Sequence, residues 1–183
     1  MRIIAGEFRG RRLKSPADYS IRPTSDKVKE AVFSIILPFF TEKTVVMDVF
    51  AGSGNMGLEA ISRGAVRAYF SDASRDSLKL VKENVTICRA QDRAIILNAD
   101  FRSAISRVTE KIDFYFLDPP YADGYMIEAL DTILDNGRLA PGGMIICEHA
   151  SRETLPEEYR DLECFRSRRY GKTGLTIYRR KTQ

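Results

Sequence analysis

Residues 48–57 have the sequence DVFAGSGNMG, and this stretch decides the fold prediction. Its glycines form the spacing G-x-G-x-x-G from Gly52 to Gly57, between an apolar segment at 44–49 and an amphipathic segment at 56–63. Glycines at this spacing let the backbone turn sharply between a strand and a helix and approach a bound ligand closely. The stretch therefore predicts the strand, loop and helix that open a doubly wound α/β sheet.

The segments around this unit continue the alternation of strands and helices. Apolar strands are predicted at 44–49, 66–71, 94–98, 112–117 and 143–147. Amphipathic helices are predicted between them at 56–63, 75–89, 103–108 and 125–136. Such alternation indicates a parallel sheet with right-handed crossovers. Two further strands, at 162–169 and 174–180, flank a turn and predict an antiparallel hairpin at one edge.

The expected fold is therefore α/β: a Rossmann-like, doubly wound and mostly parallel sheet of seven strands, with the C-terminal hairpin included. Residues 1–40 are expected to form a small basic β arm and a helix, which Ser25 caps and which ends before Pro38. Residues 41–183 are expected to form one compact domain, because no repeat or low-complexity linker divides them.

Acidic residues stand at the carboxyl ends of the predicted strands, where open α/β sheets bind ligands. Asp72 lies twenty positions beyond Gly52, where a carboxylate can accept hydrogen bonds from ribose hydroxyls. Asp100 and Phe101 follow the third strand, and they can bind the amino group and the face of adenine; alternatively, Asp100 only caps the next helix. These residues predict an adenosine cofactor. The spacing fits a nicotinamide cofactor and S-adenosylmethionine equally, and a tight turn without a ligand would need the same glycines.

The fourth strand is followed by Asp118, Pro119, Pro120 and Tyr121. Two consecutive prolines end the strand and give a stiff, extended arch. A flat base that carries an exocyclic amino group would fit such an arch: the Asp118 side chain and the Pro119 carbonyl accept its N–H bonds, and Tyr121 stacks on its ring. The alternative is a rigid turn without chemistry.

The composition excludes several classes of site. The chain has 183 residues, three widely spaced cysteines and a single histidine, so neither a zinc site nor a histidine-based nucleophile has the residues it needs. No apolar run approaches a membrane span, and the first residues lack the apolar core of a signal peptide. We therefore expect a cytoplasmic protein with reduced cysteines, no metal and no membrane partner.

Positive charge is concentrated at the two ends of the chain. Residues 1–22 contain six Lys or Arg and two Asp or Glu, and residues 166–183 contain seven Lys or Arg and no acid, whereas the net charge of the whole chain is only +4. Apolar and aromatic residues are interspersed in both ends, which favours folded basic segments over solvated tails. Such segments suggest a polyanionic partner.

Taken in order, residues 48–54, Asp72, Asp100 and the tetrapeptide 118–121 resemble the class I S-adenosylmethionine-dependent methyltransferases that methylate exocyclic or amide nitrogens. Other stretches narrow the likeness to the bacterial 16S ribosomal RNA guanine-N2 methyltransferase family: 2–6 (RIIAG), 22–24 (RPT), 57–60 (GLEA), 63–65 (RGA) and 169–171 (RYG). These stretches span nearly the whole chain. Met56 departs from the leucine expected in that family, and the change is conservative.

The resemblance implies a role for each matching residue. Asp48, Gly52 and Gly54, with Phe50, would hold the methionine part of S-adenosylmethionine. Asp72 would hold the ribose, and Asp100 and Phe101 the adenine. Catalysis on the guanine would belong to Asp118, Pro119, Pro120 and Tyr121. Phosphates of the RNA would be bound by Arg2, Arg11, Arg22, Arg169 and Lys172.

The implied reaction is methyl transfer to N2 of an unpaired or flipped-out guanine in 16S ribosomal RNA, within the small ribosomal subunit or an assembly intermediate. Enzymes that methylate adenine N6 or a protein glutamine share the central tetrapeptide, and only the basic ends argue against them. A nicotinamide oxidoreductase would leave that tetrapeptide unexplained. An RNA-binding module without catalysis would leave the cofactor edge unexplained.

Overall fold

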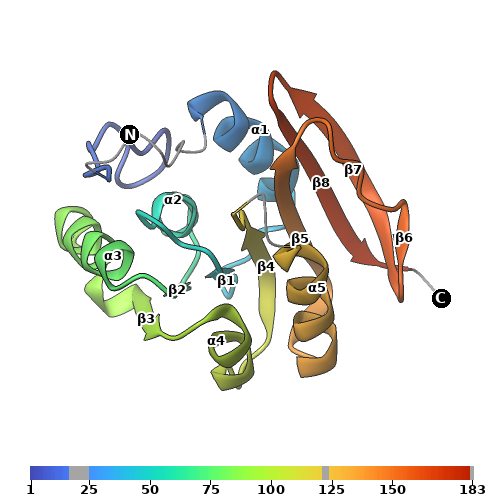
Figure 1. Cartoon of the computed structure of the whole chain (residues 1–183). Helices are drawn as coiled ribbons and strands as arrows, with labels where there is room; N and C mark the ends of the chain where they lie inside the picture. The colour runs from blue at the N-terminus through green and yellow to red at the C-terminus, as the bar shows by residue number, and fades with distance from the viewer. Residues whose placement is uncertain (17–24, 121–123, 182–183) are drawn as a thin grey trace.

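The centre of the molecule is one mixed sheet of eight strands in the order β3-β2-β1-β4-β5-β8-β7-β6 (Figure 1). We describe it from a computed structural model, over residues 1–16, 25–120 and 124–181. The strands are β1 (Val45–Asp48), β2 (Arg67–Asp72), β3 (Ala94–Asn98), β4 (Ile112–Leu117), β5 (Leu139–Ala150), β6 (Glu158–Tyr159), β7 (Leu162–Tyr170) and β8 (Thr173–Arg180).

Strands β1 to β5 are parallel, and their carboxyl ends meet at one edge of the sheet. β1 pairs with β2 on one side and with β4 on the other, β3 pairs with β2, and β5 pairs with β4. All four residues of β1 are buried, as expected of a strand covered on both faces. This arrangement confirms a Rossmann-like α/β fold.

The other strands run antiparallel to β5. β8 pairs with β5, β7 with β8, and the two-residue strand β6 with β7. The expectation of seven strands was therefore wrong by one: β6 is too short to give a periodic signal in the sequence. β5 is also longer than the predicted strand at 143–147, because its pairing with β4 resumes after a register shift.

Helices cover both faces of the sheet (Figure 1). They are α1 (Asp26–Ile36), α2 (Asn55–Ser62), α3 (Arg75–Cys88), α4 (Phe101–Arg107) and α5 (Tyr125–Asn136), with short 3-10 turns η1 (Leu37–Phe39) and η2 (Gln91–Arg93). Apolar residues of α1, α2 and α3 form one core with one face of the sheet. Those of α4 and α5 form a second core with the opposite face. We call these the α1 face and the α5 face.

The N-terminal segment lies against α2 and α3 (Figure 1) and contains no strand in its described part, residues 1–16. The expected β arm is reduced to a single antiparallel bridge between Arg2 and Arg12. The reason is that its backbone donors bind side chains: Ile4 and Ala5 donate to the Glu59 carboxylate at 2.9 and 3.1 Å. The division into residues 1–40 and 41–183 stays a prediction.

A buried ion cluster fixes this segment, α1 and α2 together. The Lys29 ammonium lies 3.1 Å from the Glu59 carboxylate and donates to the Arg2 carbonyl at 2.6 Å and to the Asn55 amide oxygen at 2.7 Å. Arg63 pairs with Glu59 at 2.7 Å. Burial lowers the pKa of Lys29, and the Glu59 charge opposes that shift. The cluster therefore depends on both charges, since a buried ion that loses its partner is strongly destabilising.

Candidate functional site

The glycine loop joins β1 to α2 and is held by the ends of two strands. Asp48, the last residue of β1, accepts a hydrogen bond from the Gly57 N–H at 3.0 Å. Asp72, the last residue of β2, accepts one from the Gly52 N–H at 2.9 Å and one from the Ser74 N–H at 2.8 Å. Two carboxylates and the loop backbone are thus fixed at the carboxyl edge of the sheet, as the sequence predicted.

The glycines of the loop have different structural roles. A Cβ at Gly57 would come within 2.3 Å of the Phe70 ring, so this glycine allows α2 to pack closely on β2. Gly54 has φ +77°, which favours glycine as the residue before α2. Gly52 has φ +53° and lines a cavity, and a Cβ there would meet nothing within 4 Å. The free space above Gly52 is therefore available to a ligand.

Asp48 is almost completely buried, and burial raises its pKa to about 7. The Gly57 N–H opposes that shift, and the nearby Asp72 charge adds to it. A buried carboxylate with a raised pKa favours a cationic ligand, because a nearby positive charge stabilises the ionised form of the carboxylate.

A cavity of about 600 Å³ extends along the carboxyl edge of the sheet. One end is lined by the glycine loop and the start of α3, and the other by the end of β4, β5 and β8. Its polar and loop lining includes Asp48, Gly52, Ser53, Asn55, Asp72, Ser74, Ser77, Asp118, Pro119, Pro120 and Glu148. Its apolar lining includes Met1, Val32, Phe50, Met56, Phe116, Tyr125, Ile146 and Leu175. Volume and lining fit a small-molecule site.

Asp118, Pro119 and Pro120 lie directly after β4 at the second end of this cavity, as predicted. Burial raises the pKa of Asp118 well above its usual range, and the charges of Glu148 and Asp48 raise it further. In the described parts of the chain, no group donates a hydrogen bond to the Asp118 carboxylate. Tyr121, predicted to stack on the base, lies outside the described residues.

Glu148 was not predicted from the sequence. Its position follows from the register of the sheet: Leu117 of β4 pairs with Cys147 of β5, so the next residues, Asp118 and Glu148, are neighbours. The sequence signal was available, since Glu148 is an acidic residue within an otherwise apolar strand. This signal could not be assigned to the site without knowing the register between β4 and β5.

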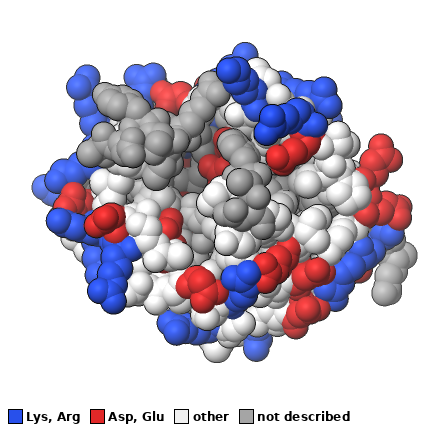
Figure 2. Space-filling view, viewed as in Figure 1, with Lys and Arg blue, Asp and Glu red and all other residues white. Residues whose placement is uncertain are grey.

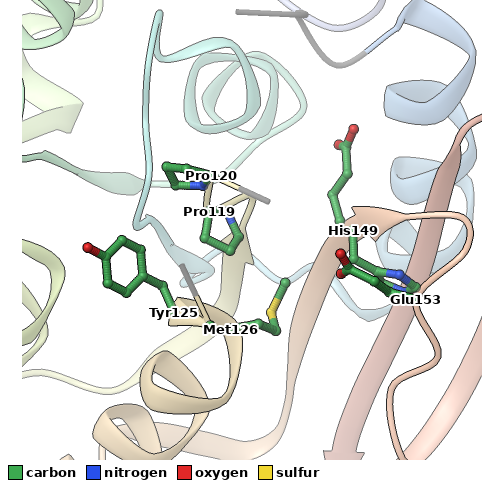
Figure 3. A pocket seen from close by; sticks show the side chains of 8 residues that line it. Pro119, Pro120, Tyr125, Met126, His149 and Glu153 are labelled. Atoms are coloured by element: carbon green, nitrogen blue, oxygen red, sulfur yellow. The ribbon is translucent and has the colours of Figure 1, made fainter. Parts of the chain in front are cut away.

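A smaller cavity of about 160 Å³ adjoins the two prolines. Figure 3 shows Pro119 and Pro120 on one side of it, His149 and Glu153 on the other, and Met126 between them. The His149 ring is used within the protein: Nδ1 lies 3.0 Å from the Ala150 carbonyl, and Nε2 lies 2.9 Å from the Thr176 hydroxyl. The smaller cavity thus leaves unoccupied space next to Pro119 and Pro120.

Asp100 and Phe101 are not among the residues that line the large cavity. The Asp100 side chain caps α4, where it accepts hydrogen bonds from the N–H groups of Arg102 and Ser103. The Phe101 ring packs against Phe50 at 5.2 Å and Tyr125 at 5.5 Å between centroids. The capping alternative for Asp100 is thus observed, and the adenine role of both residues stays a prediction.

The residues predicted to bind RNA phosphates differ in their surroundings. Arg2 pairs with Asp26 at 3.1 Å, and Arg11 donates to the Ile87 carbonyl at 3.0 Å. Arg169 and Lys172 are exposed near the turn between β7 and β8. Arg22 lies outside the described residues. Figure 2 shows Lys and Arg side chains gathered over the end of the molecule where β7 and β8 meet.

Among the described residues there is neither a metal site nor a membrane-spanning helix. They contain no cluster of three or more His, Cys, Asp or Glu residues that could hold a metal ion. Within the same residues, no helix has both the length and the apolar character needed to cross a bilayer.

Comparison with known proteins gives consistent matches over the whole chain. The family model described as conserved hypothetical protein 95 matches residues 1–179. The chain is 37% identical to YlbH of Bacillus subtilis (strain 168), over 99% of this chain and 100% of that protein. It is 32% identical to ribosomal RNA small subunit methyltransferase D of Escherichia coli (strain K12), over 100% of this chain and 91% of that protein. The solved structure of yhhF from Escherichia coli matches with a TM-score of 0.87 and 30% identity, over 100% of this chain and 99% of that chain.

Proposed function

The chain belongs to the conserved hypothetical protein 95 family, and from this premise we propose that it transfers a methyl group from S-adenosylmethionine to the exocyclic N2 of a guanine in 16S ribosomal RNA. The observation that carries the proposal is a single cavity lined at one end by the glycine loop with Asp72 and at the other by Asp118 and Pro119. A relative that matches this chain along its whole length is named as a small-subunit ribosomal RNA methyltransferase, which supports the substrate class.

The residues of the first end fit S-adenosylmethionine. The open space above Gly52 accommodates a ligand, and Asp72 has a carboxylate at the position suited to ribose hydroxyls. Asp48 would face the positively charged methionine part. When bound, the cofactor supplies a methyl group already activated by a sulfonium, so the protein contributes mainly alignment and electrostatic stabilisation.

The residues of the second end fit an aromatic amine. In this proposal Asp118 and the Pro119 carbonyl accept hydrogen bonds from the guanine amino group. The guanine N2 lone pair is delocalised into the ring, and such bonds favour the tetrahedral, nucleophilic form of the nitrogen. They also stabilise the positive charge that develops on it during transfer, and the methylated nitrogen then loses a proton to give the neutral amine. The raised pKa of Asp118 gives these bonds a second role, since incoming N–H donors stabilise its ionised form.

The test is to methylate small-subunit ribosomal RNA with the purified protein and identify the product nucleoside by mass spectrometry. We expect N2-methylguanosine. Replacing the target guanine with inosine removes only the amino group, so methyl transfer should vanish while much of the RNA affinity is retained. A methyl group on adenine would show that the tetrapeptide serves another nitrogen, and preferential binding of a nicotinamide cofactor would overturn the proposal entirely.

A further inference from the structure

Strand β7 contains a bulge that changes which of its side chains share a face. Cys164 pairs with Tyr178, and the next pairing is Arg166 with Ile177, so Phe165 and Arg166 together oppose one residue of β8. In a bulge of this kind, alternation restarts one residue later. Side chains after the bulge therefore point to the face opposite to the one that continued alternation from Cys164 would give them.

The pairing partners assign each side chain to a face. Ile177 and Leu175 belong to the core on the α1 face, and Arg166 and Arg168 pair with them. Phe165 and Tyr170 also pack against that core. The bulge thus places four side chains in one row on the α1 face, which we call the β7 row: Phe165, Arg166, Arg168 and Tyr170. Arg169 pairs with Gly174 and has the opposite parity, so it lies on the α5 face.

The two arginines of the β7 row are exposed, and no acidic residue of the described chain pairs with them. No carboxylate of the described chain lies within 4.0 Å of Arg166 or Arg168, whereas Arg179 and Arg180 on β8 pair with Glu163 and Asp161 at 2.8 Å each. The Arg166 guanidinium lies 5.7 Å from the Phe165 ring centre. Two exposed positive charges therefore lie between two aromatic rings.

The β7 row passes beside the wall of the large cavity at Arg168. Arg168 pairs directly with Leu175, and Leu175 lines that cavity together with Glu148 and Pro119. At the far end, Phe165 packs edge-to-face against Phe39, an exposed ring of η1, at 6.0 Å. With about 3.3 Å per residue along a strand, the row is on the order of 13 Å long.

We propose that the β7 row holds the single-stranded RNA segment next to the target base, with phosphates on Arg166 and Arg168 and unpaired bases stacked on Tyr170 and Phe165. Aromatic rings beside exposed guanidinium groups form a surface that unpaired nucleic acid recognises, because stacking needs exposed base faces and the backbone needs positive charge. This inference rests on the proposed function and adds to it the strand state of the substrate and the path of its backbone.

The first experiment measures RNA affinity and its salt dependence for the double variant Arg166→Gln with Arg168→Gln. The probe is an unstructured RNA oligonucleotide, compared with a blunt RNA duplex of the same length. For the single strand, we expect weaker binding and a salt slope smaller by about 1.4, from 0.7 for each of two lost phosphate contacts. Arg107→Gln, an exposed arginine of α4, removes one charge and is the matched control for each single variant, Arg166→Gln and Arg168→Gln. Arg169→Gln should weaken binding less than Arg168→Gln.

The second experiment tests stacking. Tyr170→Ala should weaken single-strand binding and raise KM for RNA about tenfold, with kcat little changed, while Tyr170→Phe should restore both values. Cofactor affinity, measured by calorimetry in every variant, reports whether the fold is intact. Equal affinity for single-stranded and duplex RNA would contradict the proposed binding of RNA by the β7 row. A larger loss of affinity in Arg169→Gln than in Arg168→Gln would contradict it too. If the protein still methylated RNA, the proposed function would be unaffected by either result. Tight binding of the cofactor by a protein that methylates no RNA would instead contradict the proposed function.

Discussion

The two ends of the large cavity differ in how their carboxylates are satisfied. At the glycine loop, Asp48 and Asp72 accept hydrogen bonds from Gly57, Gly52 and Ser74. At the end of β4, Asp118 lies beside Glu148, and no donor of the described chain reaches it. The first end is already organised to bind, whereas at the second end the described residues leave the Asp118 carboxylate able to accept the N–H groups of a ligand. We therefore expect changes at the first end to affect binding and changes at the second to affect turnover.

The largest effect should come from Asp118→Ala. We expect kcat to fall about 100- to 1,000-fold, because the lost acceptor acts mainly in the transition state. The dissociation constant of S-adenosylmethionine, measured by calorimetry, should stay close to that of the unmodified protein. Asp118→Asn, which keeps one acceptor oxygen, should retain more turnover. If Asp118→Ala lost cofactor affinity instead, the two ends would not be separable.

Asp72→Ala should have the opposite effect: it should weaken cofactor binding and leave kcat nearly unchanged. We expect cofactor affinity to fall by about 1.5–3 kcal/mol, the scale of a hydrogen bond to a charged group. At saturating cofactor, kcat should recover to near the unmodified value. Asp76→Ala removes the same charge from the first turn of α3 and is the matched control. A fall in kcat that saturating cofactor does not restore would assign Asp72 to the chemistry.

Cofactor affinity should also depend on pH through Asp48. Its pKa is raised to about 7 in the free protein, and a cationic ligand favours the ionised form, so binding should release a proton. Affinity should therefore rise with pH, by at most about tenfold per unit below this pKa, and level off above it. Asp48→Asn should flatten the dependence, and S-adenosylhomocysteine, whose sulfur is uncharged, should show a smaller one. Affinity that falls as pH rises through this range would contradict the assignment.

The smallest expected effect belongs to Glu148→Gln. The Glu148 charge raises the pKa of Asp118, and the proposed reaction needs Asp118 ionised. Removing that charge should move the acid limb of the kcat profile to lower pH by about one unit, the lower end of the effect of one close charge. A profile whose acid limb does not move would mean that the two carboxylates act independently.

Much of the site was predictable because parallel strands end at a common edge. The apolar runs located β1, β2 and β4, and the residues that interrupt them, Asp48, Asp72 and Asp118, had to converge there. The register between β4 and β5 was not predictable, since it depends on how far β5 extends before its central run. Glu148 was missed for this reason.

The remaining differences have equally local causes. The bulge at Phe165 is invisible to a period-two pattern, and it reverses the faces of Arg168 and Arg169. Lys29 and Glu59 are charged residues, which a sequence pattern assigns to the surface, but they are fully buried as a pair. The described part of the N-terminal arm, residues 1–16, forms no strand, because its donors bind the Glu59 side chain.

The docking of the N-terminal segment also sets an order of events during synthesis. Ile4 and Ala5 bind a residue 55 and 54 positions later in the chain, and Lys14 binds Asn84, 70 positions later. Residues 1–14 are therefore made long before their partners, and closing such distant contacts is slow. Met1, which lines the cavity, contacts Ser53 of the glycine loop. The N-terminal segment can thus dock once residue 84 has been made, whereas the cavity is complete only when β8, which contributes Leu175, joins the sheet.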